Sequence, residues 1–301
     1  MSTPGKPFIK KLGTIDCDLA ETTPIVFHEK LYRYEYVRKG YKLNKTGNSY
    51  NRFVDVKSGN ATPAFAPDFH LGSAYVQDET VYVYCVPKWG AETIQIFWSK
   101  DLDGWSTKPA LSLPNYEIFN TSVCRNGEKY VMAFEIGGPP DETGVPSTII
   151  RFAESQNLLN WKLTPFNRVF SKERFTACPA LRFFDGFYYM IYLAAMPDLT
   201  YETHVVRSKD LAHWENSSFN PVLHHSLEDK LIANHNLTAE QRSHIAEAVN
   251  VNNSDMDLCE FKGKTIIYYS WGDQKGIEFL AEAIYGRKLK DFFCDFFPLT
   301  R

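Results

Sequence analysis

Two acidic side chains occupy equivalent places in phrases that are typical of β-hairpins. Glu21 lies eight residues before Glu29, the turn position of the phrase IVFHEKLYRYEY, and Asp255 lies eight residues before Gly263 in MDLCEFKGKTIIYY. Two neighbouring carboxylates with different pKa values can act as a proton donor and as a base or nucleophile, which is the chemistry that glycosidic-bond hydrolysis requires. Glu21 and Asp255 are our first catalytic candidates. The alternative for each is a solvated turn residue or a strand cap.

Glu135 is the next catalytic candidate. It ends a strand-like run in the segment MAFEIGG, among apolar neighbours. Burial at that place would raise the pKa of its carboxyl group, which suits a proton donor. The alternative is an ion pair with an arginine such as Arg33, Arg151 or Arg182.

Further polar residues occupy the equivalent position, counted back from the hairpin turn, in the other phrases. Counting back from the turns of the other hairpin phrases gives His70, Asn120 and Cys178. Asp257 follows Asp255 by two residues and therefore shares its strand face. A structural role for each of these side chains is the alternative to ligand binding.

Residues outside these equivalent positions could also reach a ligand. Glu173 and Arg174 come directly before a hairpin phrase, and Trp271, like Trp89, follows a second strand, where a loop could place it against a sugar ring. With Arg182 as a further cation, the candidates for substrate binding are His70, Asn120, Glu173, Arg174, Arg182, Asp257 and Trp271.

The elements that must position these residues are five copies of one hairpin phrase. The clearest copy, FTACPALRFFDGFYYMIY at 175–192, holds an Asp-Gly pair between two aromatic runs, which is a strong signal for a two-residue hairpin turn. Four further copies, with drift, lie at 25–36, 74–84, 122–134 and 256–269. A hairpin that recurs along a chain of this length indicates a repeat architecture.

A second repeat keeps the same order. The pattern Ser-x-Asp/Asn-Leu-x-x-Trp occurs at 99–105, 155–161 and 208–214, each time after a third strand-like run. The repeating unit is a hairpin, a third strand, a polar turn and a fourth strand, as in a propeller blade. We expect the tryptophans of these turns, Trp105, Trp161 and Trp214, to be buried at equivalent places.

The sequence therefore predicts an all-β fold, a five-bladed β-propeller that forms a single domain over residues 1–301. Residues 7–15 would supply a strand that closes the ring against the last blade. Residues 227–249 have helical spacing and a capping box, so we predict a short helical insertion between blades four and five. Ring closure makes blades one and five neighbours, which brings Glu21 and Asp255 to one channel mouth. An all-β sandwich is the alternative.

The phrases SKDLDGW and SKDLAHW, together with DGFYY at 185–189, resemble those of the five-bladed propeller glycosidases, the family 43 arabinofuranosidases and xylosidases and the family 32 fructosidases. The resemblance implies an acidic residue at the start of the first inner strand, where Glu21 stands, and a catalytic glutamate before a proline on a later blade. The matching phrase here, Ala177-Cys178-Pro179, has no acid. The resemblance then implies that the acid has moved to Glu135, Glu173 or Asp255, that the family is divergent, or that catalysis is lost.

Composition excludes several partners. The net charge of −3 and the absence of a basic block give no support to nucleic-acid binding. The six cysteines form no CxxC pair and no metal site is predicted, although a structural calcium ion in the channel is left open. No run of 18 apolar residues occurs, so no membrane span is predicted. The chain as given shows no signal peptide and is expected to be cytoplasmic, or secreted or periplasmic if a leader was removed.

The resulting hypothesis is a glycosidase that cleaves a small oligosaccharide or glycoside with carboxylates at the channel mouth. Two alternatives stand beside it. One is a non-catalytic carbohydrate-binding propeller. The other is a glycoside phosphorylase, which should gather cations such as Arg174, Arg182 and His70 for phosphate. The sequence predicts that no cofactor is needed. It makes no prediction of the oligomeric state.

Overall fold

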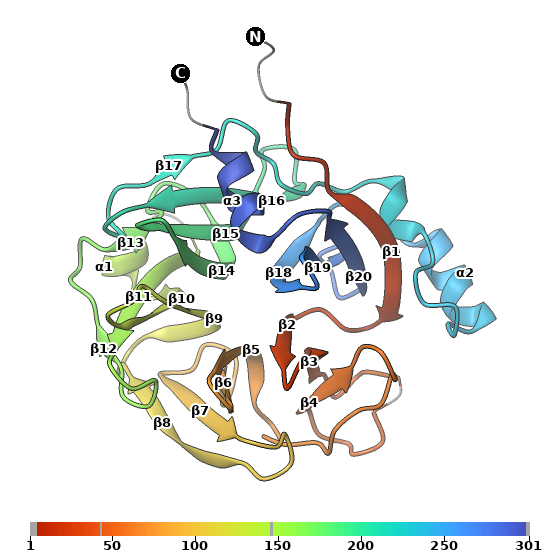
Figure 1. The fold of residues 1–301 in the computed structure, drawn as a ribbon, viewed down its shortest axis with the longest axis horizontal. Coiled ribbons are helices and arrows are strands. Elements are labelled where there is room, and N and C mark those ends of the chain that lie inside the picture. Colours follow the sequence, from red (N-terminus) through yellow and green to blue (C-terminus); the bar gives the residue numbers. More distant parts are fainter. Residues whose placement is uncertain (1–4, 43, 145–146, 299–301) are drawn as a thin grey trace.

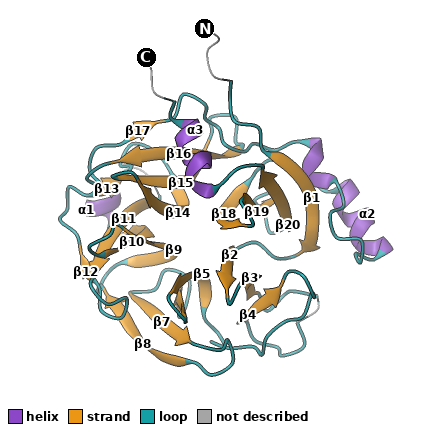
Figure 2. Ribbon diagram, in the orientation of Figure 1, coloured by secondary structure: helices purple, strands orange, loops and turns teal. Residues whose placement is uncertain are grey.

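The computed structural model describes residues 5–42, 44–144 and 147–298. Five small antiparallel sheets are arranged in a ring around a central axis (Figure 1), and helices form only a small part of the fold (Figure 2). The five-bladed propeller predicted from the two repeats is confirmed. None of the helices in these ranges is long and apolar enough to cross a membrane.

Each blade has its innermost strand at the axis and its later strands progressively further out. The first two blades comprise β2 (Thr22–Phe27), β3 (Lys30–Val37) and β4 (Tyr50–Asp55), and then β5 (His70–Gln77), β6 (Thr80–Val86), β7 (Thr93–Ser99) and β8 (Ser106–Ser112). The third comprises β9 (Glu117–Arg125), β10 (Tyr130–Gly138), β11 (Ile149–Ser155) and β12 (Lys162–Leu163), with β13 (Val169–Phe170) also on β11. Over the described residues, blade one has three strands where the repeat predicts four.

The last two blades follow the same order. Blade four comprises β14 (Thr176–Phe184), β15 (Phe187–Ala195), β16 (Tyr201–Ser208) and β17 (Glu215–Asn216). Blade five comprises β18 (Ser254–Phe261), β19 (Lys264–Gly272) and β20 (Glu278–Tyr285), and its outermost strand is β1 (Lys10–Cys17). Because β1 pairs antiparallel with β20, the start of the chain completes the last blade and closes the ring, as predicted.

The hairpin turns have the backbone that the sequence indicates. Asp185 and Gly186 have φ values of 50° and 80°, and Lys262 and Gly263 have values of 51° and 75°. Asp and Gly tolerate this left-handed region better than other residues do. The turns therefore fix the register from which the channel-mouth residues were counted.

The polar turns are equivalent in three blades. Their leucines, Leu102, Leu158 and Leu211, are buried with φ values of 65° to 66°. Trp161 is buried and donates its indole N–H to the Leu158 carbonyl at 2.8 Å. Trp105 and Trp214 are only partly buried, so the prediction that all three are buried is corrected: each of these two packs one ring face on aromatic neighbours near the blade's outer edge.

The helical segments lie at different places on the ring (Figure 2). The predicted insertion forms η1 (Leu227–Lys230) and α2 (Ala239–Glu247), and α1 (Pro140–Thr143) is a single turn in blade three. The Thr238–Gln241 capping box is present at the start of α2. The C-terminal α3 (Leu289–Phe296) buries Phe292, Phe293 and Phe296 completely against blades four and five.

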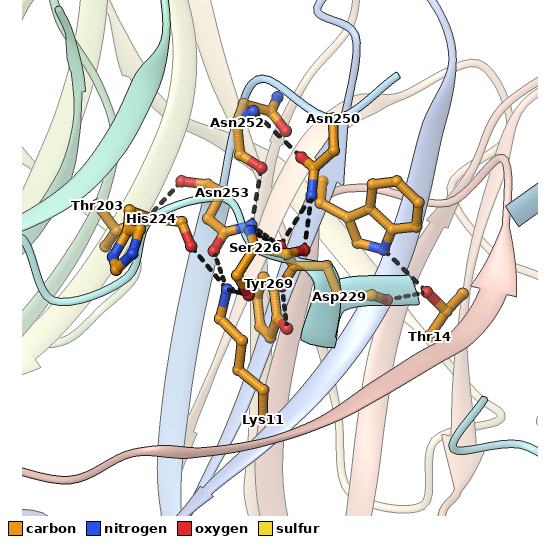
Figure 3. Close-up of polar contacts among 11 residues, drawn as sticks. Lys11, Thr14, Thr203, His224, Ser226, Asp229, Asn250, Asn252, Asn253 and Tyr269 are labelled. Atoms are coloured by element: carbon orange, nitrogen blue, oxygen red, sulfur yellow. Dashed lines mark hydrogen bonds and ion pairs between the residues drawn. The ribbon is translucent and has the colours of Figure 1, made fainter. Parts of the chain in front are cut away.

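A buried ion pair connects the insertion to the closing strand (Figure 3). Lys11 Nζ of β1 lies 2.7 Å from Asp229 Oδ1 of η1, and both side chains are shielded from water. Asp229 also accepts hydrogen bonds from Tyr269, from Asn250 and from Asn253, at 2.8, 2.8 and 3.2 Å. The network therefore ties the ring closure to the segment that leads into β18.

The burial of Trp161 generates a stability prediction. We expect Trp161→Ala to lower the free energy of unfolding by about 3–5 kcal/mol, because it removes a large side chain from a packed cluster. Trp89→Ala, at a 58% exposed tryptophan, is the matched control and should change it by less than about 0.5 kcal/mol. Urea unfolding of both variants checks this, and equal losses would contradict the assignment.

The buried Lys11–Asp229 pair generates a second stability prediction. Asp229→Asn leaves the Lys11 charge buried without a counter-charge and turns an amide toward the Asn250 and Asn253 donors, so we expect a loss of about 3–5 kcal/mol. Glu215→Gln, which breaks the exposed pair with Arg207, should cost no more than about 1 kcal/mol. Denaturation midpoints that fall equally in the two variants would refute a structural role for the buried pair.

Candidate active site

The inner strands of all five blades line one small cavity of about 30 Å³ in the channel. This is room for a water molecule rather than for a whole sugar, so the cavity is the floor of a site. Its lining is mostly polar and comprises Glu21, Thr22, Thr23, Gly72, Ser73, Asn120, Thr121, Cys178, Pro179, Asp255, Met256 and Asp257. The predicted residues Glu21, Asn120, Asp255 and Asp257 are thus brought together, and Cys178 lies with them.

Three inner strands bulge at the same level of the channel. Leu71, Cys178 and Asp255 have φ values of 53°, 51° and 49°, and the strand register shifts at each of them. A bulge re-aims the side chain at which it occurs. Cys178 and Asp255 are the residues that counting back from the turns predicted, whereas in blade two the bulge falls at Leu71, one residue after the predicted His70, which is outside the cavity lining.

Glu135 reaches this level from β10, the second strand of blade three. Its Oε2 accepts hydrogen bonds from Asn120 Nδ2 at 3.0 Å and from the backbone N–H of Cys178 at 3.1 Å. Burial raises the pKa of the Glu135 carboxyl to about 7, and the charges of Asp255 and Glu21 add to the rise against the two hydrogen bonds. The predicted elevated pKa is therefore present, and Glu135 has no arginine partner among the described residues.

Glu21 is held by Arg38, which directly follows β3. The guanidinium NH2 lies 3.0 Å from Glu21 Oε1 and 3.3 Å from Oε2. Burial raises the pKa of the Glu21 carboxyl, Arg38 opposes this, and the neighbouring Asp255 charge reinforces it. The other end of the guanidinium bonds to Glu278 of β20.

Asp255 completes the group of carboxylates. It is half-buried and accepts a hydrogen bond from the Ser270 hydroxyl at 2.7 Å. Its negative charge acts on Glu21 and Glu135 alike. Burial and these carboxylates raise the pKa of the Cys178 thiol well above its usual value, so Cys178 is a thiol and not a nucleophilic thiolate.

His70, Tyr36 and Trp89 form one wall beside the carboxylates. His70 Nδ1 lies 2.5 Å from the Tyr36 hydroxyl, and burial lowers the pKa of His70. The Trp89 ring packs edge-to-face with Phe119, at 6.2 Å between ring centroids, and is more than half exposed. Burial and the Glu21 charge raise the pKa of Tyr36 to about 12, with a small opposing effect from Trp89, so Trp89 lies near Tyr36 on the side of the carboxylates.

Other predicted binding residues lie elsewhere. Arg182 bonds to Asp257 at 2.5 Å and to the Leu258 carbonyl at 2.6 Å, and it lines a separate cavity of about 270 Å³ between the turn-side halves of the inner strands. Asp257 is thus occupied by an ion pair. Glu173 and Arg174 are exposed on the turn before β14 and are outside the lining of the carboxylate cavity.

The prediction that Trp271 stacks on a sugar is wrong. Its side chain is fully buried, stacks on Phe279 at 4.4 Å between centroids and donates its indole N–H to the Thr14 hydroxyl at 2.8 Å. The closing strand β1 covers the position that the sequence suggested was an open loop. Trp89, the other tryptophan outside the repeated turns, is the exposed one.

Sequence reasoning missed Arg38 and Glu278. Arg38 lies one residue beyond a strand and Glu278 opens one, and neither belongs to a repeated phrase. No local pattern marks them, because it is ring closure between distant segments that places the end of β3 and the start of β20 beside Glu21. In the described ranges, no group of three or more His, Cys, Asp or Glu side chains is arranged to hold a metal ion.

Comparisons with known proteins agree with this fold. Neither models of known families nor curated sequences match the chain. Among solved structures, an α-L-arabinofuranosidase from Podospora anserina in complex with cellotriose has a TM-score of 0.60 at 10% identity, covering 91% of both chains. A GH43 β-xylosidase/α-arabinofuranosidase from a compost metagenome, in complex with xylotriose, has a TM-score of 0.53 at 16% identity, covering 94% of this chain and 95% of its own. A GH43_1 enzyme from Xanthomonas citri, in complex with xylotriose, has a TM-score of 0.56 at 12% identity, covering 92% of this chain and 89% of its own.

These likenesses establish the five-bladed propeller that the repeats predicted, and they confirm the resemblance at the level of the fold. With identities of 10–16%, they do not carry residue roles to this chain. The chemistry therefore has to be argued from the carboxylate group itself.

The raised pKa of Glu135 predicts a pH-dependent cost to stability. The folded state holds the Glu135 proton up to about pH 7, whereas the ordinary value is 4.5, so stability is lost as the pH rises through this window. Glu135→Gln should remove this dependence and gain up to about 3 kcal/mol at pH 8 relative to pH 4. Urea unfolding of Glu135→Gln and of the exposed Glu215→Gln at both pH values checks this. A gain that is equal at the two pH values would contradict the buried, protonated carboxyl.

Proposed function

We propose that this chain is a glycosidase that hydrolyses a small neutral glycoside at the channel mouth. The observation that carries the proposal is the place of Glu135. Its carboxyl group accepts the backbone N–H of Cys178, so an acid from blade three stands where the Ala177-Cys178-Pro179 phrase of blade four lacks one. A displaced acid is an alternative to lost catalysis, and this contact supports it.

The surroundings of the three carboxylates support distinct roles. Glu135, with a pKa of about 7, is a proton donor to the leaving oxygen at neutral pH. Glu21 lies against the Arg38 guanidinium, which favours its ionised form, and is our choice for the carboxylate that activates water. Asp255 raises the pKa of Glu135 and so helps to keep the donor protonated.

The charge of the site supports a neutral substrate. Glu21, Asp255 and Glu278 are three carboxyl groups around the guanidinium of Arg38, and the Glu21 and Asp255 charges also act on Glu135. Such a site repels a carboxylate or a phosphate on the substrate. A phosphorylase would need additional cations. Its candidates Arg174, Arg182 and His70 lie outside the cavity lining, and burial of His70 lowers its pKa and so disfavours its charged form, which favours water over phosphate as the acceptor.

The bound ligands and names of the similar structures suggest which glycosides to test first. Two of these proteins are complexed with xylotriose, and two are named as arabinofuranosidases. We therefore propose xylosides and arabinofuranosides as first substrates for this chain. The exposed face of Trp89 would pack on the apolar face of such a sugar ring.

The test is cleavage of a panel of aryl xylosides, arabinofuranosides and hexosides, with and without inorganic phosphate. We expect cleavage that does not depend on phosphate, and a fall in kcat of at least about 100-fold in each of Glu21→Gln, Glu135→Gln and Asp255→Asn, because each change removes a charge or proton that the transition state needs. Glu282→Gln, at a half-buried glutamate of β20 outside the cavity lining, is the matched control and should retain wild-type turnover.

Three results would contradict the proposal. Turnover that requires phosphate would show a phosphorylase. Sugar binding to a wild-type protein that cleaves nothing on the panel would show a carbohydrate-binding propeller. Near-normal turnover in all three carboxylate variants would place the chemistry elsewhere in the molecule.

A further inference from the structure

One arginine joins the first and last blades at the channel mouth. The guanidinium of Arg38 bonds through NH2 to Glu21, with its shorter contact at 3.0 Å, and through NH1 to Glu278. The Glu21 and Glu278 side chains are 8% and 16% exposed. Two carboxylates that are largely shielded from water therefore share one positive charge.

The backbone fixes all three partners independently of this contact. The Glu278 carbonyl accepts the N–H of Asp18, in the connection between β1 and β2, at 2.8 Å. The Arg38 carbonyl accepts the N–H of Tyr41 and the side-chain amide of Asn44, both at 3.0 Å. Glu21 directly precedes β2. The bridge is therefore built from three separately anchored segments, which makes its geometry specific.

Resting on the proposed function, we propose that Glu278 is a positioning residue for Glu21. It shares the Arg38 guanidinium with Glu21, fixes where that group lies and limits how much of its positive charge acts on Glu21. Glu278 is outside the cavity lining, so it acts through Arg38 rather than on the substrate.

Other titratable groups lie around Arg38, Glu21 and Glu278 and respond to how the Arg38 charge is shared. The negative charge of Asp255, on β18, affects the pKa values of Glu21, Arg38 and Glu278. Tyr36 of β3 lies beside Glu21 and Arg38. The charges of Glu21 and Asp255 in turn raise the pKa of the Glu135 carboxyl. Burial raises the pKa of Glu278 to about 7, with Arg38 opposing and Glu21 reinforcing the rise. Loss of the Glu278 proton near neutral pH then adds a negative charge that competes with Glu21 for Arg38.

The direct test is a ¹³C NMR titration of the Glu21 side-chain carboxyl in the full chain labelled at glutamate Cδ. The Glu21 signal is assigned by its loss in Glu21→Gln. In Glu278→Gln the guanidinium is left to Glu21, so the Glu21 midpoint should fall by about one pH unit, and in Arg38→Met it should rise by at least about one. Glu282→Gln, on the same strand and without contact to Arg38, should leave the midpoint unchanged.

A second readout measures the catalytic consequence. In Glu278→Gln the acidic limb of kcat/KM should move to lower pH with little change in KM, and Glu278→Asp should restore part of the wild-type profile. A Glu21 midpoint that does not move in Glu278→Gln, or that moves equally in Glu282→Gln, overturns the proposal. A shifted midpoint in a protein that cleaves no glycoside supports the Arg38 bridge and refutes the proposed function, so the two failures are distinguishable.

Discussion

The pairing of β1 with β20 is the constraint on which the candidate site depends. It joins the first strand of the chain to the last blade, and the connection that follows β1 leads directly to Glu21. β2 also packs against β18, and Arg38 bonds to both Glu21 and Glu278, so the closed ring fixes Glu21 relative to Asp255 and Glu278. The buried Lys11–Asp229 pair reinforces the same seam and reaches Asn253, two residues before Asp255 (Figure 3).

Once the ring is closed, the site is dominated by the cost of burying negative charge. Several carboxyl groups face a narrow channel, and Arg38 neutralises only part of their charge. Burial therefore favours the protonated forms, and the pKa values of Glu21, Glu135 and Glu278 all rise. A folded protein accepts such a cost at a functional site, since a carboxyl that keeps its proton near neutral pH can donate it.

The sequence was most informative where a local pattern repeats. The Asp185-Gly186 turn and its copies carry their own conformational signal, so the blade count, the ring closure and the level of Asp255 could all be predicted. Trp271 and the bridge of Arg38 to Glu278 could not, because their surroundings are set by strands from opposite ends of the chain. A tryptophan after a strand looks the same in sequence whether another strand covers it or not.

The pH dependence of kcat/KM on a cleaved glycoside tests the central claim most directly. If Glu135 is the proton donor, kcat/KM should fall about tenfold for each pH unit above about pH 7, as the Glu135 carboxyl loses its proton. This basic limb should be absent from whatever activity Glu135→Gln retains. A wild-type profile that stays flat well above pH 7, or a basic limb that survives in Glu135→Gln, would contradict the account.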